Sequence, residues 1–130
     1  MATTQQTMTV GELLKKAMSL MGEESKNENG YAPFVTDLVN GLLADCFSVN
    51  NTVRESAGKQ PLTSIPTVTK TTDVLPYEYE TLVNVMVYGL AYWLLFQDDE
   101  SDKANVCNMM YEQNKVRFAK AAYADVESMY

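Results

Sequence analysis

The chain has 130 residues, a length typical of one domain, and 46% of them are hydrophobic, which is enough to build a core. Its formal net charge is −7 and its isoelectric point is about 4.5, which argues against a protein that binds nucleic acid through a basic patch. The sequence contains no histidine, which excludes histidine-based catalytic triads and removes the commonest metal ligand.

No segment is expected to cross a membrane or to direct export. The most apolar stretch, Leu82–Phe96, is shorter than the roughly 20 residues that a spanning helix needs. The N-terminus lacks the basic start and apolar run of a signal peptide. The two cysteines, Cys46 and Cys107, match no zinc or redox spacing, which favours buried free thiols in a reduced cytosolic environment.

The first helix is expected to begin at Thr9. Residues 1–8 are polar and without pattern, so we expect a flexible N-terminus. Thr9 with Glu12 forms the sequence signature of a capping box, and Gly22 is a natural end for the helix. The apolar stripe between them indicates core packing, with a partner-docking helix as the alternative.

The second helix is expected to begin at Pro33, because proline suits the first helical position. An apolar pattern continues through Phe47, and the helix either breaks at Asn50-Asn51 or continues until Gly58.

Residues 59–75 differ from the helical segments on both sides. Two prolines and alternating threonines favour extended structure, and residues 67–74 could form one arm of a β-hairpin. A long segment of this kind is often functional, although it could also be a solvated crossover. We expect it to be an interaction loop that contacts a neighbouring subunit. The interface candidates are Leu62, Ile65, Val68 and Val74.

The third helix, Pro76–Gln97, is the strongest predicted element. It is apolar nearly all round, which is typical of a central buried helix, and Gly89 would let a neighbour approach closely. The residues expected to be buried are Leu82, Met86, Leu90, Trp93 and Leu94, packed against Leu38, Leu42, Cys107, Tyr111 and Phe118.

The acidic run Asp98–Asp102 is predicted to be a tight turn before a last helix that starts near Ser101. The two final helices then form an antiparallel hairpin. The run lacks the glycine and the closing glutamate of an EF-hand loop, so no metal site is predicted. Residues 121–130 form a C-terminal tail with more apolar side chains than a solvated helix end needs.

No catalytic, cofactor-binding or metal-binding residues are predicted, and the chain is not expected to be an enzyme. No glycine-rich phosphate loop is present. Glu78 and Glu80 lie two apart on a predicted helix and so point in different directions. Neither cysteine has neighbouring cations that would favour a thiolate.

The order of several short motifs resembles the head–tail connector (adaptor) proteins of tailed bacteriophages. The resemblance covers roughly residues 34–122 and depends on the order and spacing of motifs that encode helix starts and close packing. The segment Gly58–Val74 is longer than in a minimal adaptor. The motifs are Asp37-Leu38-Val39-Asn40-Gly41-Leu42-Leu43, Leu75-Pro76, Tyr88-Gly89-Leu90-Ala91, Asp98–Asp102 and Asn108-Met109-Met110-Tyr111.

The resemblance implies a single mainly α domain, residues 1–130: a bundle of about four helices with an extended loop or β-hairpin inserted between the second and third. It implies a structural virion protein in the phage neck, assembled in the bacterial cytoplasm. There it would form a homo-oligomeric ring, commonly twelve-fold, that joins the portal protein to tail or further neck ring proteins and extends the DNA channel without specific DNA binding. The alternative is a small helical interaction or regulatory module unrelated to virions.

Two further sets of residues receive roles within this resemblance. Acidic side chains suit a channel wall, because like charge keeps DNA from adhering as it slides. The channel-facing candidates are Asp98, Asp99, Glu100, Asp102, Glu112, Asp125 and Glu127. The candidates for docking on the portal or the next ring are Tyr123, Val126, Met129 and Tyr130.

Overall fold

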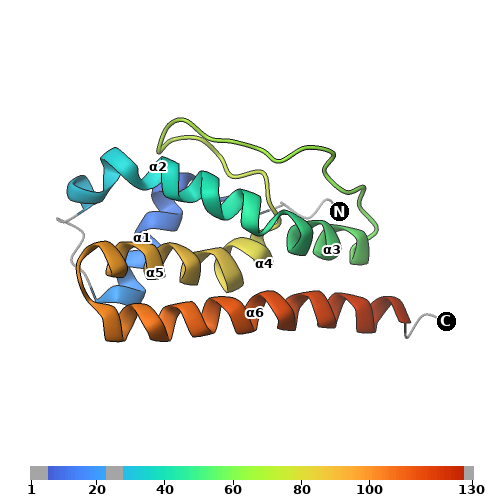
Figure 1. Cartoon of the computed structure of the whole chain (residues 1–130). Coiled ribbons are helices and arrows are strands. Elements are labelled where there is room, and N and C mark those ends of the chain that lie inside the picture. Colours follow the sequence, from blue (N-terminus) through green and yellow to red (C-terminus); the bar gives the residue numbers. More distant parts are fainter. Residues whose placement is uncertain (1–5, 23–27, 128–130) are drawn as a thin grey trace.

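The computed structural model describes residues 6–22 and 28–127, and for residues 28–29 and 120–127 it describes the backbone alone (Figure 1). The chain is mainly helical, as predicted. The helical elements are α1 (Val10–Met21), α2 (Glu28–Asp45), α3 (Phe47–Ser56), α4 (Tyr79–Thr81), a π-helical segment (Leu82–Met86), α5 (Val87–Gln97) and α6 (Ser101–Glu127).

The predicted boundaries of α1 are confirmed. The Thr9 hydroxyl accepts a hydrogen bond from the Glu12 amide, and the Glu12 carboxylate accepts one from the Thr9 amide, both at 3.1 Å. These bonds satisfy backbone donors that the first helical turn leaves without partners. Gly22 ends the helix with φ 76°, a left-handed conformation that glycine adopts at little cost.

The second predicted helix is divided differently from expectation. α2 begins at Glu28, so the predicted start at Pro33 is wrong: the proline lies inside the helix near its N-terminal end. The break falls at Cys46, where α2 and α3 meet at 58°, and not at Asn50-Asn51. Asn50 and Asn51 lie inside α3, and the Asn50 side-chain carbonyl accepts a hydrogen bond from the Glu78 amide at 2.8 Å.

The central helix begins at Tyr79, three residues later than the predicted Pro76, and continues through α4, the π segment and α5. The sequence did not predict the π segment. Within it, the backbone carbonyl of Asn84 accepts a hydrogen bond from the side-chain amide of Asn114 at 2.8 Å. Four of the five predicted core residues of this helix are buried: Leu82, Met86, Leu90 and Leu94.

Trp93 was also expected in the core, and that prediction is wrong, because its side chain is 40% exposed. Its predicted neighbours differ in burial: Leu42 and Tyr111 are buried, whereas Leu38, Cys107 and Phe118 are partly buried. Trp93 lies where α2 and α6 leave part of α5 uncovered, which opens the groove described below.

The helices surround α5 (Figure 1). α2 lies along one edge of α5, α6 runs antiparallel along the other, and α1 crosses behind. α3 continues from α2 and packs against the C-terminal half of α6. The predicted hairpin of α5 and α6 is therefore confirmed, with a turn in which Asp99 has φ 60°.

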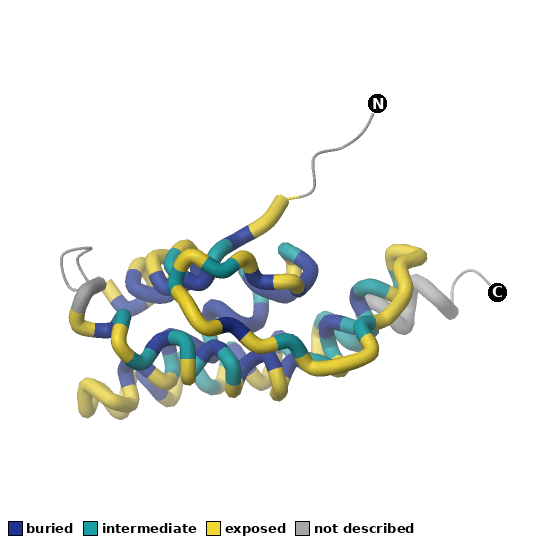
Figure 2. The backbone as a smooth tube through the Cα atoms, turned by 90° about the horizontal axis from the view of Figure 1, so that it is seen from above, coloured by how far each residue is buried: buried dark blue, intermediate teal, exposed yellow. Residues whose placement is uncertain are grey.

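Residues 57–78 cross over the outside of α2 and α3 (Figure 1). Much of this crossover is exposed (Figure 2). The β-hairpin considered for residues 67–74 does not form; an isolated antiparallel bridge between Thr9 and Val74 is found there. Two helix asparagines hold the crossover: the Asn40 side chain bonds both backbone groups of Val68, and the Asn51 side chain bonds both of Leu62, at 2.7–3.1 Å.

No single helix in the described part of the chain is long and apolar enough to span a membrane. Within the same residues, only α2 and α3 taken together, across their 58° bend, reach that length and composition.

Candidate functional site

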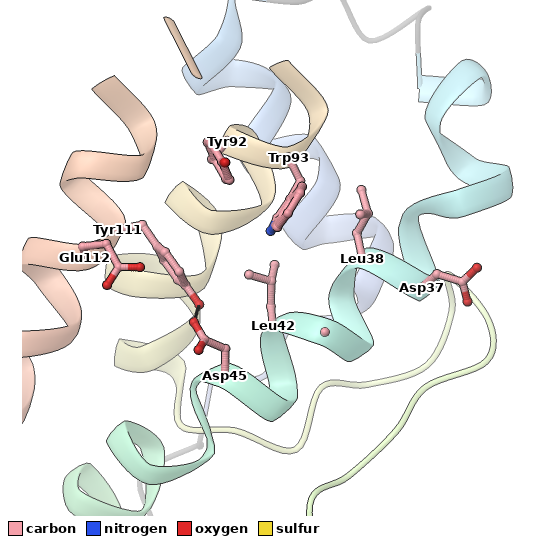
Figure 3. Close-up of a pocket in the computed structure, with 9 residues that line it drawn as sticks. Asp37, Leu38, Leu42, Asp45, Tyr92, Trp93, Tyr111 and Glu112 are labelled. Carbon is pink, nitrogen blue, oxygen red and sulfur yellow. Dashed lines mark hydrogen bonds between the residues drawn. The ribbon is translucent and has the colours of Figure 1, made fainter. Parts of the chain in front are cut away.

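A groove of about 370 Å³ opens between α2, α5 and α6 (Figure 3). Its lining is mixed: aromatic and aliphatic side chains form the floor, and carboxylates lie at the edges. The lining residues are Asp37, Leu38, Gly41, Leu42, Asp45, Tyr92, Trp93, Tyr111 and Glu112.

Gly89 brings the walls of this groove together. A Cβ atom at Gly89 would lie 2.6 Å from Leu42 Cδ2 and 2.7 Å from Tyr111 Cε1, closer than real side chains approach. The absence of a side chain therefore lets α2 and α6 pack directly on α5. This confirms the close approach that the sequence predicted at Gly89.

A polar cluster joins α2 to α6 at one end of the groove. The Tyr111 hydroxyl donates a hydrogen bond to the Asp45 carboxylate and lies 3.2 Å from Cys46 Sγ. Lys115 Nζ lies 2.8 Å from the Asp45 carboxylate and 3.2 Å from that of Glu112, and it stands 4.5 Å from the centre of the Tyr111 ring. One lysine is thus shared between two acids.

The protonation states of this cluster follow from burial and hydrogen bonding. Burial opposes the charge on Asp45, but the hydrogen bonds from Lys115 and Tyr111 outweigh it and hold the pKa of Asp45 below its ordinary value. Burial raises the pKa of Cys46 to about 11. Burial also raises the pKa of Tyr111 above its ordinary value. Cys46 is therefore a neutral thiol at pH 7, and the cluster provides no thiolate nucleophile.

Three aromatic side chains of α5 gather at the exposed side of the groove. The ring centres of Tyr92 and Trp93 are 5.0 Å apart, and the Phe96 ring lies 6.1 Å from each. Phe96 is 57% exposed and Trp93 is 40% exposed. We call Tyr92, Trp93 and Phe96 the aromatic cluster. It presents large apolar surface to solvent, which is unusual for side chains that could have been buried.

A second charged cluster lies at the start of α4. The Glu78 side chain is mostly buried and pairs with Arg54 Nη1 at 3.0 Å and with Lys59 Nζ at 2.8 Å. It ties α3 and the crossover to the central helix. Because both cations pair with Glu78 of the same chain, we interpret this cluster as structural.

The four predicted interface residues differ in how far their side chains are exposed. Ile65 and Val74 are exposed and Leu62 is half-buried. Val68 is only 5% exposed, because the hydrogen bonds from Asn40 hold this part of the crossover against α2. Val68 therefore offers little surface to a neighbour.

The predicted channel and docking residues also differ in what the structure describes. Asp98, Asp99, Glu100 and Asp102 are exposed around the turn, and Asp98 accepts a hydrogen bond from the Tyr31 hydroxyl at 2.7 Å. Glu112 is exposed but paired with Lys115. The remaining candidates lie outside the described side chains: Tyr123, Asp125, Val126, Glu127, Met129 and Tyr130.

Among the described residues, no group of three or more cysteine, aspartate or glutamate side chains is arranged to hold a metal ion. Both cysteines are free, with Cys46 buried and Cys107 half-buried. Sequence reasoning missed the groove, because Asp37, Asp45 and Trp93 gave no sign of sharing a surface. The resemblance motifs did contain Asp37 and Tyr111, but only as marks of helix packing.

Comparisons with known protein families, with characterised proteins and with solved structures find no match to this chain.

Proposed function

We propose that this chain is a subunit of a ring in the neck of a tailed bacteriophage, where it joins the portal to the tail and extends the DNA channel. On this proposal α1, α2 with α3, α4 with α5, and α6 are the four helical units of a connector domain, and the crossover is its inserted loop. The proposal starts from the motif order of residues 34–122. The structural observation that carries it is the exposed aromatic cluster beside the groove.

The aromatic cluster supports an assembly role because of its composition and position. Tryptophan and tyrosine dominate the binding energy of protein interfaces, especially in pockets that a partner can desolvate. Here Trp93 lies beside a groove while Phe96 stays largely exposed. A chain that worked alone would gain stability by covering these rings, so their exposure favours a partner protein.

Exposed apolar side chains on other elements agree with several contact surfaces. A subunit in a stacked ring touches a neighbour on each side and a different partner above and below. Large hydrophobic side chains are exposed on α1, on the crossover, on α5 and on α6. Among the side chains that the structure describes, those outside the aromatic cluster are Leu20, Ile65, Val74, Val106, Met109 and Val116.

The charge distribution suits a passage for DNA. The turn between α5 and α6 carries exposed carboxylates, and the chain as a whole is acidic. A rim of this charge would repel the phosphate backbone, which favours sliding over binding.

The direct test is to locate the chain in virus particles. Particles purified from the source culture should contain it by mass spectrometry, and gold-labelled antibody should mark one point between head and tail in electron micrographs. Absence of the chain from particles, or label elsewhere, contradicts the proposal. A soluble complex with a single regulatory partner would support the alternative module.

A matched pair of variants tests the aromatic cluster in the same particles. Phe96→Asp places a charge on an exposed ring position and should leave a folded helical protein that is not incorporated. Gln97→Asp adds the same charge one residue along, also at an exposed position, and should be incorporated normally. Equal incorporation of both variants would remove the aromatic cluster from the proposal.

A further inference from the structure

The groove is negatively charged around its aromatic floor. Asp37, Asp45 and Glu112 line it, and Lys115 is shared between the last two of these acids. Among the described residues, no cation forms an ion pair with Asp37. The groove therefore keeps unbalanced negative charge beside the indole of Trp93. A long cationic side chain fits such a site, because its stem packs on the ring and its charge meets the acids.

The outer face of α1 carries the opposite charge. Lys15, Lys16, Ser19 and Leu20 are exposed on this helix. The acid of α1 is Glu12, whose carboxylate accepts a hydrogen bond from the Thr9 amide, so two lysines face one acid. Lys16 and Leu20 are four residues apart and so lie next to each other on the helix surface. This α1 face combines lysine charge with an exposed leucine, in a chain whose net charge is −7.

The α1 face and the groove are separate surfaces. Figure 1 shows α1 crossing behind α5. Figure 3 shows the same arrangement: α1 lies behind the α5 ribbon, and the Trp93 side chain of α5 faces the groove. Lys16, Ser19 and Leu20 line a different hollow together with Val83, Val87 and Tyr88, none of which lines the groove.

We propose that the groove receives the Lys16–Leu20 face of α1 from a second copy of this chain. Lys16 of one copy then lies over Trp93 and meets Asp37 of the next, while Leu20 packs on the aromatic cluster. The contact joins two different surfaces, so each end of a pair leaves one surface, an α1 face or a groove, available for a further copy. Repetition gives a closed ring or an open filament, and the expectation of a closed ring rests on the proposed function.

Zero-length crosslinking tests the contact in the full chain. Equal amounts of ¹⁴N- and ¹⁵N-labelled protein are mixed at about 1 mM, a concentration at which even millimolar contacts are substantially populated. A carbodiimide then activates carboxylates, which form amides with lysines at ion-pair distance. We expect mixed-isotope peptides that join Lys15 or Lys16 to Asp37 or Glu112. No mixed-isotope link between these residues, in a sample that otherwise reacts, overturns the proposal.

Charge reversal provides the matched variants. Asp37→Lys and Lys16→Asp should each reduce the mixed-isotope links at the remaining lysine and acid of the contact by at least about tenfold, because like charges then face each other. The double variant keeps the native net charge and should restore a link between positions 16 and 37, with the acid and the lysine exchanged. Glu55→Lys, at an exposed position of α3 outside the groove, is the control and should have no effect. A double variant that links no better than the single variants overturns the proposal.

The outcomes separate this contact from the proposed function. Closed rings in electron micrographs with links at other residues would contradict the contact and leave the neck protein proposal standing. Links between α1 and the groove in open filaments, from a chain absent from virus particles, would support the contact and contradict the neck protein proposal.

Discussion

Two connections in this chain differ in what satisfies their backbone hydrogen-bonding groups. The turn between α5 and α6 is short, and its own backbone holds it: the Asp98 amide bonds the Leu94 carbonyl at 3.1 Å, and the Glu100 amide bonds the Leu95 carbonyl at 2.9 Å. The crossover, residues 57–78, is long and without helix or strand. Local bonds satisfy part of its backbone, as where the Asp73 carboxylate accepts hydrogen bonds from the Thr69 and Lys70 amides. Helix side chains and the N-terminus of α1 bond further backbone groups.

The asparagines show how this works. Asn40 and Asn51 each offer one donor and one acceptor, and each pairs with both the N–H and the C=O of a single crossover residue. A side-chain amide thus takes the place of a neighbouring strand. A long segment without helix or strand can therefore be held against a helix, without a sheet, by asparagines spaced along that helix. The hairpin of α5 and α6 depends instead on apolar packing.

The largest expected effect is on the packing of the hairpin. Leu90 is fully buried on α5, and Leu90→Ala should lower the free energy of unfolding by roughly 2–5 kcal/mol through lost transfer energy and a residual cavity. Urea denaturation followed by circular dichroism measures the change. Leu20→Ala, at an exposed position, is the control and should cost much less. Equal losses would mean that the hairpin is not the stable core.

The next effect concerns the crossover. Asn40→Ala removes both hydrogen bonds to Val68 and leaves its backbone groups buried without partners, so we expect a loss of about 1–3 kcal/mol. Hydrogen exchange should become faster at the Val68 amide. Asn40→Asp keeps the acceptor and loses the donor, and should protect that amide in part. Unchanged exchange in Asn40→Ala would show that the asparagine does not hold the crossover.

A smaller effect is expected at the N-terminus of α1, which lies against the crossover. Thr9→Ala removes the hydroxyl that accepts the Glu12 amide, and should cost about 1 kcal/mol. Thr7→Ala, at an exposed position before the helix, should change nothing measurable. Thermal denaturation of the two variants gives the difference. A larger loss from Thr7→Ala would contradict the assignment of the cap.

The smallest expected effect is on stability at acidic pH. The pKa of Asp45 is below its ordinary value of 3.8 in the folded chain, because the hydrogen bonds from Lys115 and Tyr111 outweigh its burial. Its contribution to stability is therefore present above about pH 4 and is lost as the pH falls through the folded pKa. The side chain is half exposed, so solvent screening keeps the contribution small. Asp45→Asn should destabilise the protein at pH 7 more than at pH 3, whereas a pH-independent loss would contradict this account.

Local signals in the sequence predicted part of this fold. The capping box at Thr9, the end at Gly22 and the close approach at Gly89 each depend on one or two residues and on rules that act over a few positions. The bend at Cys46 and the π segment depend on tertiary contacts, since α3 turns to pack on α6 and Asn114 bonds the Asn84 carbonyl. No local pattern contains that information.

The candidate site was the least predictable part. Its acids and aromatic rings come from three helices, and they share a surface only because Gly89 allows those helices to meet. The threonines and prolines of the crossover indicated that it would not be helical, and the structure has no helix or strand there. They did not indicate that Asn40 and Asn51 would hold it, because an asparagine in a helix pattern looks like an ordinary solvated side chain.

Trp93 makes occupation of the groove measurable by intrinsic fluorescence. It is the single tryptophan of the chain, it is 40% exposed, and it lines the groove. Its emission therefore comes from one environment, with no background from other indoles. A side chain that covers the ring would displace water, shift the emission to shorter wavelength and shield the indole from a soluble quencher such as acrylamide. Occupation of the groove can thus be followed by titration in the unlabelled native protein.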